Sequence, residues 1–236
     1  MDGTEPLAGP AGPSPGLLRR LYREEGRVWK TQYRRYFKYA ARALGLGFVA
    51  GFVYFMVWPA QQVKALGLVA KAFKDIPMEA PPLAFAISLF FHNVRASLFP
   101  VAAGVVPFIG LPILDPVING GALGLLVSIS HRQGLDVPRL VLTQILPHGL
   151  VELPAVLYAT SIGLYLSAGT GRLIVAAWKA RGGRRYPDPA AAPGPEPGIP
   201  GPARLALDAV RSFVLVILPL LAVAAFVEAF VTPNLR

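Results

Sequence analysis

Long stretches of this chain contain no charged residue, and they limit what it can fold into more than any other feature. The stretch 43–63 is one example. A helix needs about 20 apolar residues to cross the hydrocarbon core of a bilayer. Charged residues make up only 15% of the sequence, whereas about 25% is usual for a soluble domain. The sequence therefore predicts an all-α, polytopic membrane helix bundle.

The apolar stretches predict about five membrane spans. Two apolar regions, 83–114 and 140–170, are too long for one straight crossing, because 32 residues of helix measure about 48 Å. Each region carries polar residues near its start, so we expect broken or re-entrant helices there, at His92 to Arg95 and at Pro147 to Gly149. The predicted spans are 43–63, 96–114, 116–130, 150–170 and 212–231.

The distribution of basic residues predicts the orientation of the chain. Nine basic residues lie between Arg19 and Arg42, and seven lie between Arg172 and Arg211. The segments 64–82 and 131–139 together hold three Lys and two Arg. Because basic residues gather on the cytoplasmic side of membrane proteins, we expect the N-terminus inside and the C-terminus outside, in a multi-pass plasma membrane protein.

The remaining segments complete the predicted domain organisation. Residues 1–16 are rich in Pro and Gly, which is typical of a disordered tail. Residues 17–42 alternate basic and apolar side chains at helical spacing, which predicts a basic amphipathic interfacial helix. Residues 43–236 form the predicted transmembrane domain, in which 172–211 is a cytoplasmic linker.

The net charge of +10 suggests an anionic partner. Many basic residues flank apolar spans, so we expect membrane lipids and no nucleic acid. The chain has no cysteine, which excludes disulfides, thiolate catalysis and Cys-ligated metals. It also has no nucleotide-binding loop and no zinc-protease spacing of His and Glu. We therefore predict no catalytic residue, no metal and no cofactor, and leave homo-oligomer formation open.

Polar residues inside the apolar regions are the strongest functional signal. A charged side chain there costs roughly 2.5 to 3.5 kcal/mol on insertion scales, so it needs a partner, water or a role. One interpretation is structural, with Arg95 paired to Glu152. A second is a water-filled path, and a third is catalysis, which would need a nucleophile or a metal. The predicted intramembrane polar cluster is His92, Asn93, Arg95, Asn119, His148 and Glu152.

Two further features belong to the ends and packing of the spans. Glu228 lies near the outer end of the last span, where it is either a hydrated terminus or a contact for a partner. Gly120 and Gly124 have the small-xxx-small spacing that lets helix backbones approach closely. We expect them to open a tight helix contact in the third span.

Four short motifs resemble those of a known family. They are FFHNVR at 90–95, NGG at 119–121, LPHGLVELP at 146–154 and FVEAFVTP at 226–233. In order and spacing they resemble the stage II sporulation protein M family. The resemblance implies a membrane scaffold for forespore engulfment, which recruits hydrolases that thin septal peptidoglycan.

Two functional hypotheses follow. The first is a non-enzymatic scaffold whose outer face, formed by 64–82, 131–139 and the C-terminus, binds cell-wall hydrolase partners. The second is a channel or transporter component whose path is lined by His92, Arg95, His148 and Glu152. They differ in their tolerance of a charge swap: a scaffold should tolerate Arg95→Glu combined with Glu152→Arg, whereas a conducting path should not.

Overall fold

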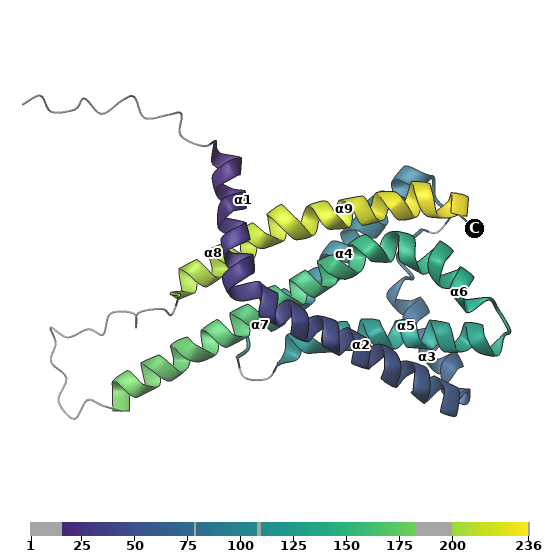
Figure 1. Cartoon of the computed structure of the whole chain (residues 1–236), viewed down its shortest axis with the longest axis horizontal. Helices are drawn as coiled ribbons and strands as arrows, with labels where there is room; N and C mark the ends of the chain where they lie inside the picture. The colour runs from purple at the N-terminus through teal and green to yellow at the C-terminus, as the bar shows by residue number, and fades with distance from the viewer. Residues whose placement is uncertain (1–15, 78, 108–109, 183–199, 236) are drawn as a thin grey trace, which may run out of the picture.

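The computed structural model describes residues 16–77, 79–107, 110–182 and 200–235. Within these ranges the chain forms helices joined by short turns and contains no strand. Five of the described helical stretches are long and apolar enough to cross a membrane, and they run roughly side by side (Figure 1). The predicted fold class, an all-α bundle with about five helices long and apolar enough to span a membrane, is confirmed.

The first helical stretch joins the amphipathic segment to the first span. It consists of α1 (Leu17–Val28), a π-helical turn η1 (Trp29–Tyr33) and α2 (Arg34–Val57). Helix α1 stands at an angle to α2 (Figure 1). The stretch ends just before Pro59, as expected from a residue that cannot continue a helix. A second helix, α3 (Ala60–Ala72), follows directly.

The break predicted at His92 to Arg95 is in the wrong place. Helix α4 runs unbroken over Pro82–Ala103, so the span predicted at 96–114 is corrected to this range. Polar side chains project from the helix surface and leave the backbone hydrogen bonds intact, so they need not end a helix, whereas glycine has a low helix propensity and readily adopts the positive φ of a turn. The chain leaves the helix at Gly104 and turns through Gly110, whose φ is +65°.

The third span agrees closely with its predicted range. A short 3-10 turn, η2 (Leu111–Ile113), leads into α5 (Leu114–Arg132). The predicted limits were 116–130. Gly134, with a φ of +70°, then reverses the chain outside the helix.

The second predicted break is also displaced. Helix α6 (Val137–Leu140) passes through a π-helical turn, η3 (Val141–Ile145), into α7 (Leu146–Gly182). The backbone is α-helical at 147–149, and the irregular turn lies just before it. Helix α7 has 37 residues, about 55 Å at 1.5 Å per residue, so it is longer than a bilayer core.

The last helical stretch begins earlier than predicted. It comprises α8 (Pro202–Ser212), η4 (Phe213–Ile217), α9 (Leu218–Phe226) and η5 (Val227–Val231), with a final 3-10 turn, η6 (Thr232–Leu235). The predicted linker is therefore helical at both ends. Its Pro-rich part at 187–199, like the predicted tail at 1–15, lies outside the described residues.

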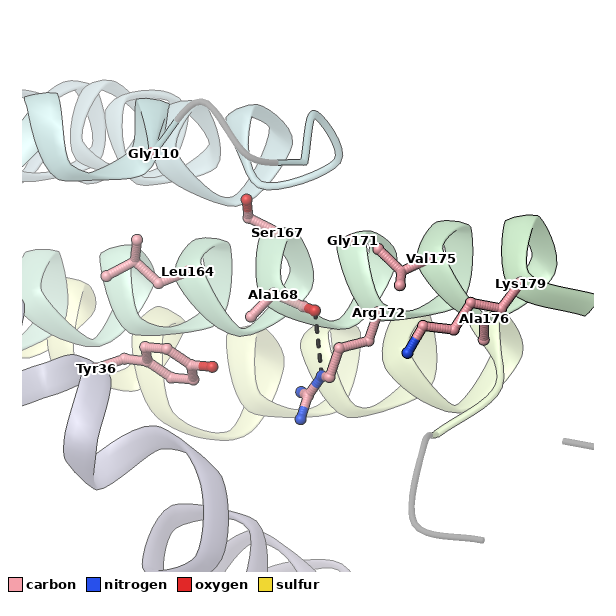
Figure 2. Close-up of a pocket in the computed structure, with 10 residues that line it drawn as sticks. All are labelled: Tyr36, Gly110, Leu164, Ser167, Ala168, Gly171, Arg172, Val175, Ala176 and Lys179. Carbon is pink, nitrogen blue, oxygen red and sulfur yellow. Dashed lines mark hydrogen bonds between the residues drawn. The ribbon is translucent and has the colours of Figure 1, made fainter. Parts of the chain in front are cut away.

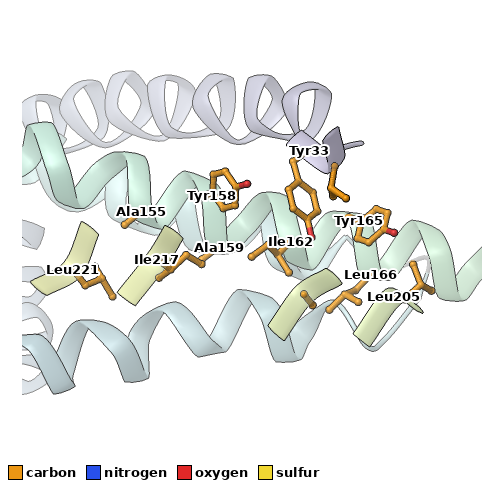
Figure 3. Close-up of a cluster of buried hydrophobic side chains, with 12 residues drawn as sticks. Tyr33, Ala155, Tyr158, Ala159, Ile162, Tyr165, Leu166, Leu205, Ile217 and Leu221 are labelled. Atoms are coloured by element: carbon orange, nitrogen blue, oxygen red, sulfur yellow. The ribbon is translucent and has the colours of Figure 1, made fainter. Parts of the chain in front are cut away.

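Helix α7 forms the centre of the bundle. In the most apolar 18 residues of α7, 61% of the residues are buried, whereas the corresponding share in the other four apolar helical stretches is 17% to 33%. Figure 3 shows α7 between the η1 region and the α8 and α9 stretch, with Tyr33, Ile162 and Ile217 in the buried cluster. Removing these apolar side chains from solvent and lipid into a close-packed core holds the helices in one arrangement.

Glycines bring two pairs of helices into direct backbone contact. A Cβ added to Gly124 would lie 2.5 Å from the Phe48 carbonyl oxygen of α2, and one added to Gly120 would overlap the Leu44 carbonyl. The predicted tight contact of the third span is thus confirmed. A similar approach joins the end of α4 to α7: a Cβ added to Gly104 would overlap the Gly163 backbone, and one added to Gly163 would overlap the Pro100 carbonyl.

The two ends of the bundle are formed by different helices and differ in charge. Helix α3, helix α6 and the C-terminus lie at one end, and we call it the α3 end (Figure 1). Helix α1, the start of α8 and the end of α7 lie at the other, which we call the basic end. The basic end carries Arg172, Lys179 and Arg204. The segments predicted to lie on the cytoplasmic side and those predicted to lie outside are therefore at opposite ends of the bundle.

Candidate functional site

A hollow beside α3 brings together two residues of the predicted polar cluster. It has a volume of about 280 Å³ and is formed by α3, α5 and α7. Asn119 of α5 and Glu152 of α7 line it, among mostly apolar neighbours. These two side chains are the polar groups of an otherwise apolar hollow. The apolar lining residues include Leu66, Val69, Phe73, Leu123, Leu126 and Leu153.

The orientation of Asn119 is set by its own helix. Its Nδ2 donates to the Asp115 backbone oxygen at 2.9 Å and lies 3.4 Å from the Asp115 carboxylate. Residues four apart in a helix share a face, so this pairing follows directly from the sequence spacing. It holds the amide at the wall of the hollow.

His92 and Arg95 lie in a different hollow. This second space, of about 320 Å³, is lined by Asp75, His92 and Arg95 with two alanines. Phe73 stands between the two: its ring stacks on His92 at 5.1 Å between centroids, and it also lines the first hollow. The predicted cluster is therefore divided at the end of α3.

The predicted ion pair between Arg95 and Glu152 does not occur. No hydrogen bond or salt bridge joins these two residues in the described part of the chain, and they line separate hollows. Arg95 is exposed and shares its hollow with the carboxylate-bearing Asp75 instead. The turn after α3 brings Asp75 close in space, which sequence spacing alone does not reveal.

The remaining predicted residues take up other positions. Asn93 is only 6% exposed and lies with Ser97 on the buried face of α4. Glu228 is half-buried in η5, which packs against α4. The side chain of His148 lies outside the described residues. Among the residues that are described, no three His, Asp or Glu side chains are grouped as a metal site would require.

The basic end contains a buried polar network that the sequence reasoning missed. Glu25 of α1 is 4% exposed, and its carboxylate accepts hydrogen bonds from Tyr158 at 2.5 Å and Ser212 at 2.8 Å. Arg211 donates to the same carboxylate at 3.1 Å. Ser212 lies 3.2 Å from the Tyr33 hydroxyl. Elements from both ends of the chain therefore meet around one buried charge.

A second carboxylate extends this network. Asp208 forms ion pairs with Arg211 at 3.0 Å and Arg204 at 3.2 Å, and accepts a hydrogen bond from Tyr165 at 3.2 Å. Arg204 also reaches Glu24 on α1, at 3.1 Å. Buried charges persist only when they are paired and hydrogen-bonded. Each buried charge here has an ion-pair partner and at least one hydrogen bond, while Asp208 Oδ1 and Arg211 Nη2 contact each other as an ion pair without one.

A signal for the network was present in the sequence. Glu24 and Glu25 are the only acidic residues among nine basic ones between Leu17 and Arg42. Asp208 and Arg211 stand three apart just before the last span, on one helix face. An acidic pair within a basic helix, and a charged pair entering a span, both indicate partners inside the protein.

Comparison with known proteins gives one match. The family model described as stage II sporulation protein M matches residues 41–233, which is most of the chain. No curated protein and no solved structure matches the chain significantly. The matched range includes both hollows and most of the network, but it begins after α1 and Glu25.

Proposed function

Because the chain belongs to the stage II sporulation protein M family, we propose that it is a membrane scaffold that recruits peptidoglycan-remodelling partners during engulfment. In this proposal the protein catalyses nothing itself, and hydrolysis belongs to the partners. The α3 end faces outward and binds them, in accordance with the excess of basic residues at the opposite end.

The observation that carries the proposal is the apolar hollow beneath α3. Val63 and Leu68 of α3 are 79% and 68% exposed, and Leu66 is exposed while it also lines the hollow. A partner's apolar side chain fits such a space, and Asn119 and Glu152 provide hydrogen-bonding groups for its polar atoms. A membrane-anchored hydrolase could present both kinds of group on one helix.

The division of the polar cluster favours the scaffold over the channel hypothesis. A conducting path requires its polar residues to line one continuous space. Here Asn119 and Glu152 line one hollow, whereas His92 and Arg95 line another across Phe73. Two separate hollows can each bind a different group of a partner protein, as the scaffold hypothesis requires.

The proposal is tested by crosslinked purification of the tagged protein from its native membrane. We expect peptidoglycan hydrolases among the bound proteins, and their loss with Glu152→Ala. Arg95→Ala serves as the matched control, because it also removes a charge of the predicted cluster but lies outside the Asn119 hollow. If no envelope enzyme is recovered with the unmodified protein, the scaffold proposal is wrong.

A further inference from the structure

The basic end contains a groove that is distinct from the hollows described above. Figure 2 shows it along one face of α7, beside Tyr36 of α2 and Gly110 of the turn after α4. Its volume is about 550 Å³. Arg172 and Lys179 supply its charge, and none of the ten described residues that line it is acidic.

The two cations face the groove without a carboxylate partner. Arg172 donates from Nε to the Ala168 carbonyl at 3.2 Å, which leaves its two terminal nitrogens directed away from the helix (Figure 2). Neither Arg172 nor Lys179 forms a salt bridge within the described ranges. They stand seven residues apart, so they share one face of α7. Their charge is available to an anionic ligand.

The groove changes from apolar to charged along α7. Leu164 lies eight residues before Arg172, about 12 Å deeper toward the centre of the bundle. Ala168 and Val175 continue the apolar wall. Lys179 follows these apolar lining residues, close to the end of α7 at Gly182. A phospholipid in a leaflet has the same order, with acyl carbons inside and phosphate at the surface.

Trp178 places the membrane surface at this level independently. Its side chain is 76% exposed, next to Lys179. Exposed tryptophans of membrane proteins sit at the headgroup level, where the indole ring meets both lipid and water. Lys179 therefore lies at the headgroup level, and Arg172, seven residues earlier, lies about 10 Å deeper along α7.

We propose that this groove binds one anionic phospholipid, with its phosphate on Arg172, its headgroup near Lys179 and an acyl chain over Leu164. Arg35 adds further positive charge close by, since its guanidinium lies 4.6 Å above the Tyr36 ring and donates to the Tyr36 hydroxyl. The site is therefore electrostatically selective for a net negative headgroup over a zwitterionic one.

The test measures thermal unfolding of the full-length protein in nonionic detergent. Dioctanoyl phosphatidylglycerol, dioctanoyl phosphatidylcholine and inorganic phosphate are each titrated, and the rise in Tm gives an apparent Kd because a ligand that binds only the folded state stabilises it. We expect a saturable rise with phosphatidylglycerol alone. An equal response to phosphatidylcholine, or to inorganic phosphate, would overturn the assignment of an anionic lipid.

Variants locate the binding in the groove. Arg172→Gln combined with Lys179→Gln should weaken phosphatidylglycerol binding by about tenfold or more, as two charge-assisted contacts are lost. Ala168→Phe, which fills the groove without changing charge, should also weaken it. The control, Arg23→Gln with Lys30→Gln, removes the same charge from exposed positions on α1 and η1 and should bind normally. Equal affinity in the groove variants and the control would disprove the site.

Discussion

Glu25 and Arg211 are 186 residues apart in the sequence, yet Arg211 Nε lies 3.1 Å from the Glu25 carboxylate, and both side chains are buried. This contact joins the N-terminal helix α1 to the helix that begins the last span. It gives the amphipathic segment a fixed position against the bundle, in addition to whatever contact its basic face makes with lipid.

Removing the Arg211 side chain should therefore destabilise the folded protein strongly. Arg211→Ala leaves the Glu25 carboxylate buried without its cation, a change that typically costs about 3 to 5 kcal/mol in the free energy of unfolding. Arg204→Ala is the matched control, because Arg204 also pairs with two carboxylates but its side chain is 44% exposed. We expect it to cost about 1 kcal/mol or less. Denaturant unfolding in detergent compares the two, and equal losses would contradict the role of Glu25 as a buried anchor.

Neighbouring glycines in α5 should respond oppositely to the same substitution. Gly120→Ala puts a methyl group against the Leu44 backbone of α2 and should destabilise the protein by about 1 to 3 kcal/mol. Gly121→Ala finds its nearest neighbour, the Gly47 carbonyl oxygen, at 3.9 Å. It should be neutral or slightly stabilising. Thermal unfolding of both variants checks this, and a similar loss in both would argue against direct α2 to α5 backbone contact.

The sequence predicted the helix bundle and the tight glycine contact because both depend on local patterns. Apolar length determines whether a helix spans, and small residues four apart determine where backbones meet. The predicted break at His92 is wrong because polar side chains do not by themselves disrupt a helix backbone, and the helix instead ends at Gly104, before the turn at Gly110.

The division of the polar cluster could not be predicted from spacing. It depends on where α3 ends, because Phe73 reaches His92 of α4 while it also faces the hollow of Asn119. The partner of Glu25 is similarly remote in sequence. Contacts of this kind are set by how the helices pack, and no periodic pattern reports them.

Charge substitutions in the two hollows should act independently. Arg95→Glu and Glu152→Arg lie in separate spaces, so the change in unfolding free energy of the double variant should equal the sum of the single changes within about 0.5 kcal/mol. A double-mutant cycle measures this. If the swapped pair restored stability, the two side chains would interact, and the division at Phe73 would be wrong.

Membrane orientation can be tested with single cysteines, since the chain has none of its own. Leu135→Cys lies in the exposed turn at the α3 end, and Ala203→Cys is exposed at the basic end. A membrane-impermeant maleimide should label the first in intact cells and the second only after permeabilisation. The reverse result would invert the predicted topology.

Site-specific photo-crosslinking tests the scaffold claim most directly. A photoreactive amino acid placed at Leu68 of α3 should form adducts with peptidoglycan hydrolases in living cells, because this side chain is exposed beside the proposed partner site. The same amino acid at Leu207 of α8, which is 58% exposed at the basic end, should form none of these adducts. Absence of hydrolase adducts at Leu68, or equal adducts at both positions, would contradict recruitment at the α3 end.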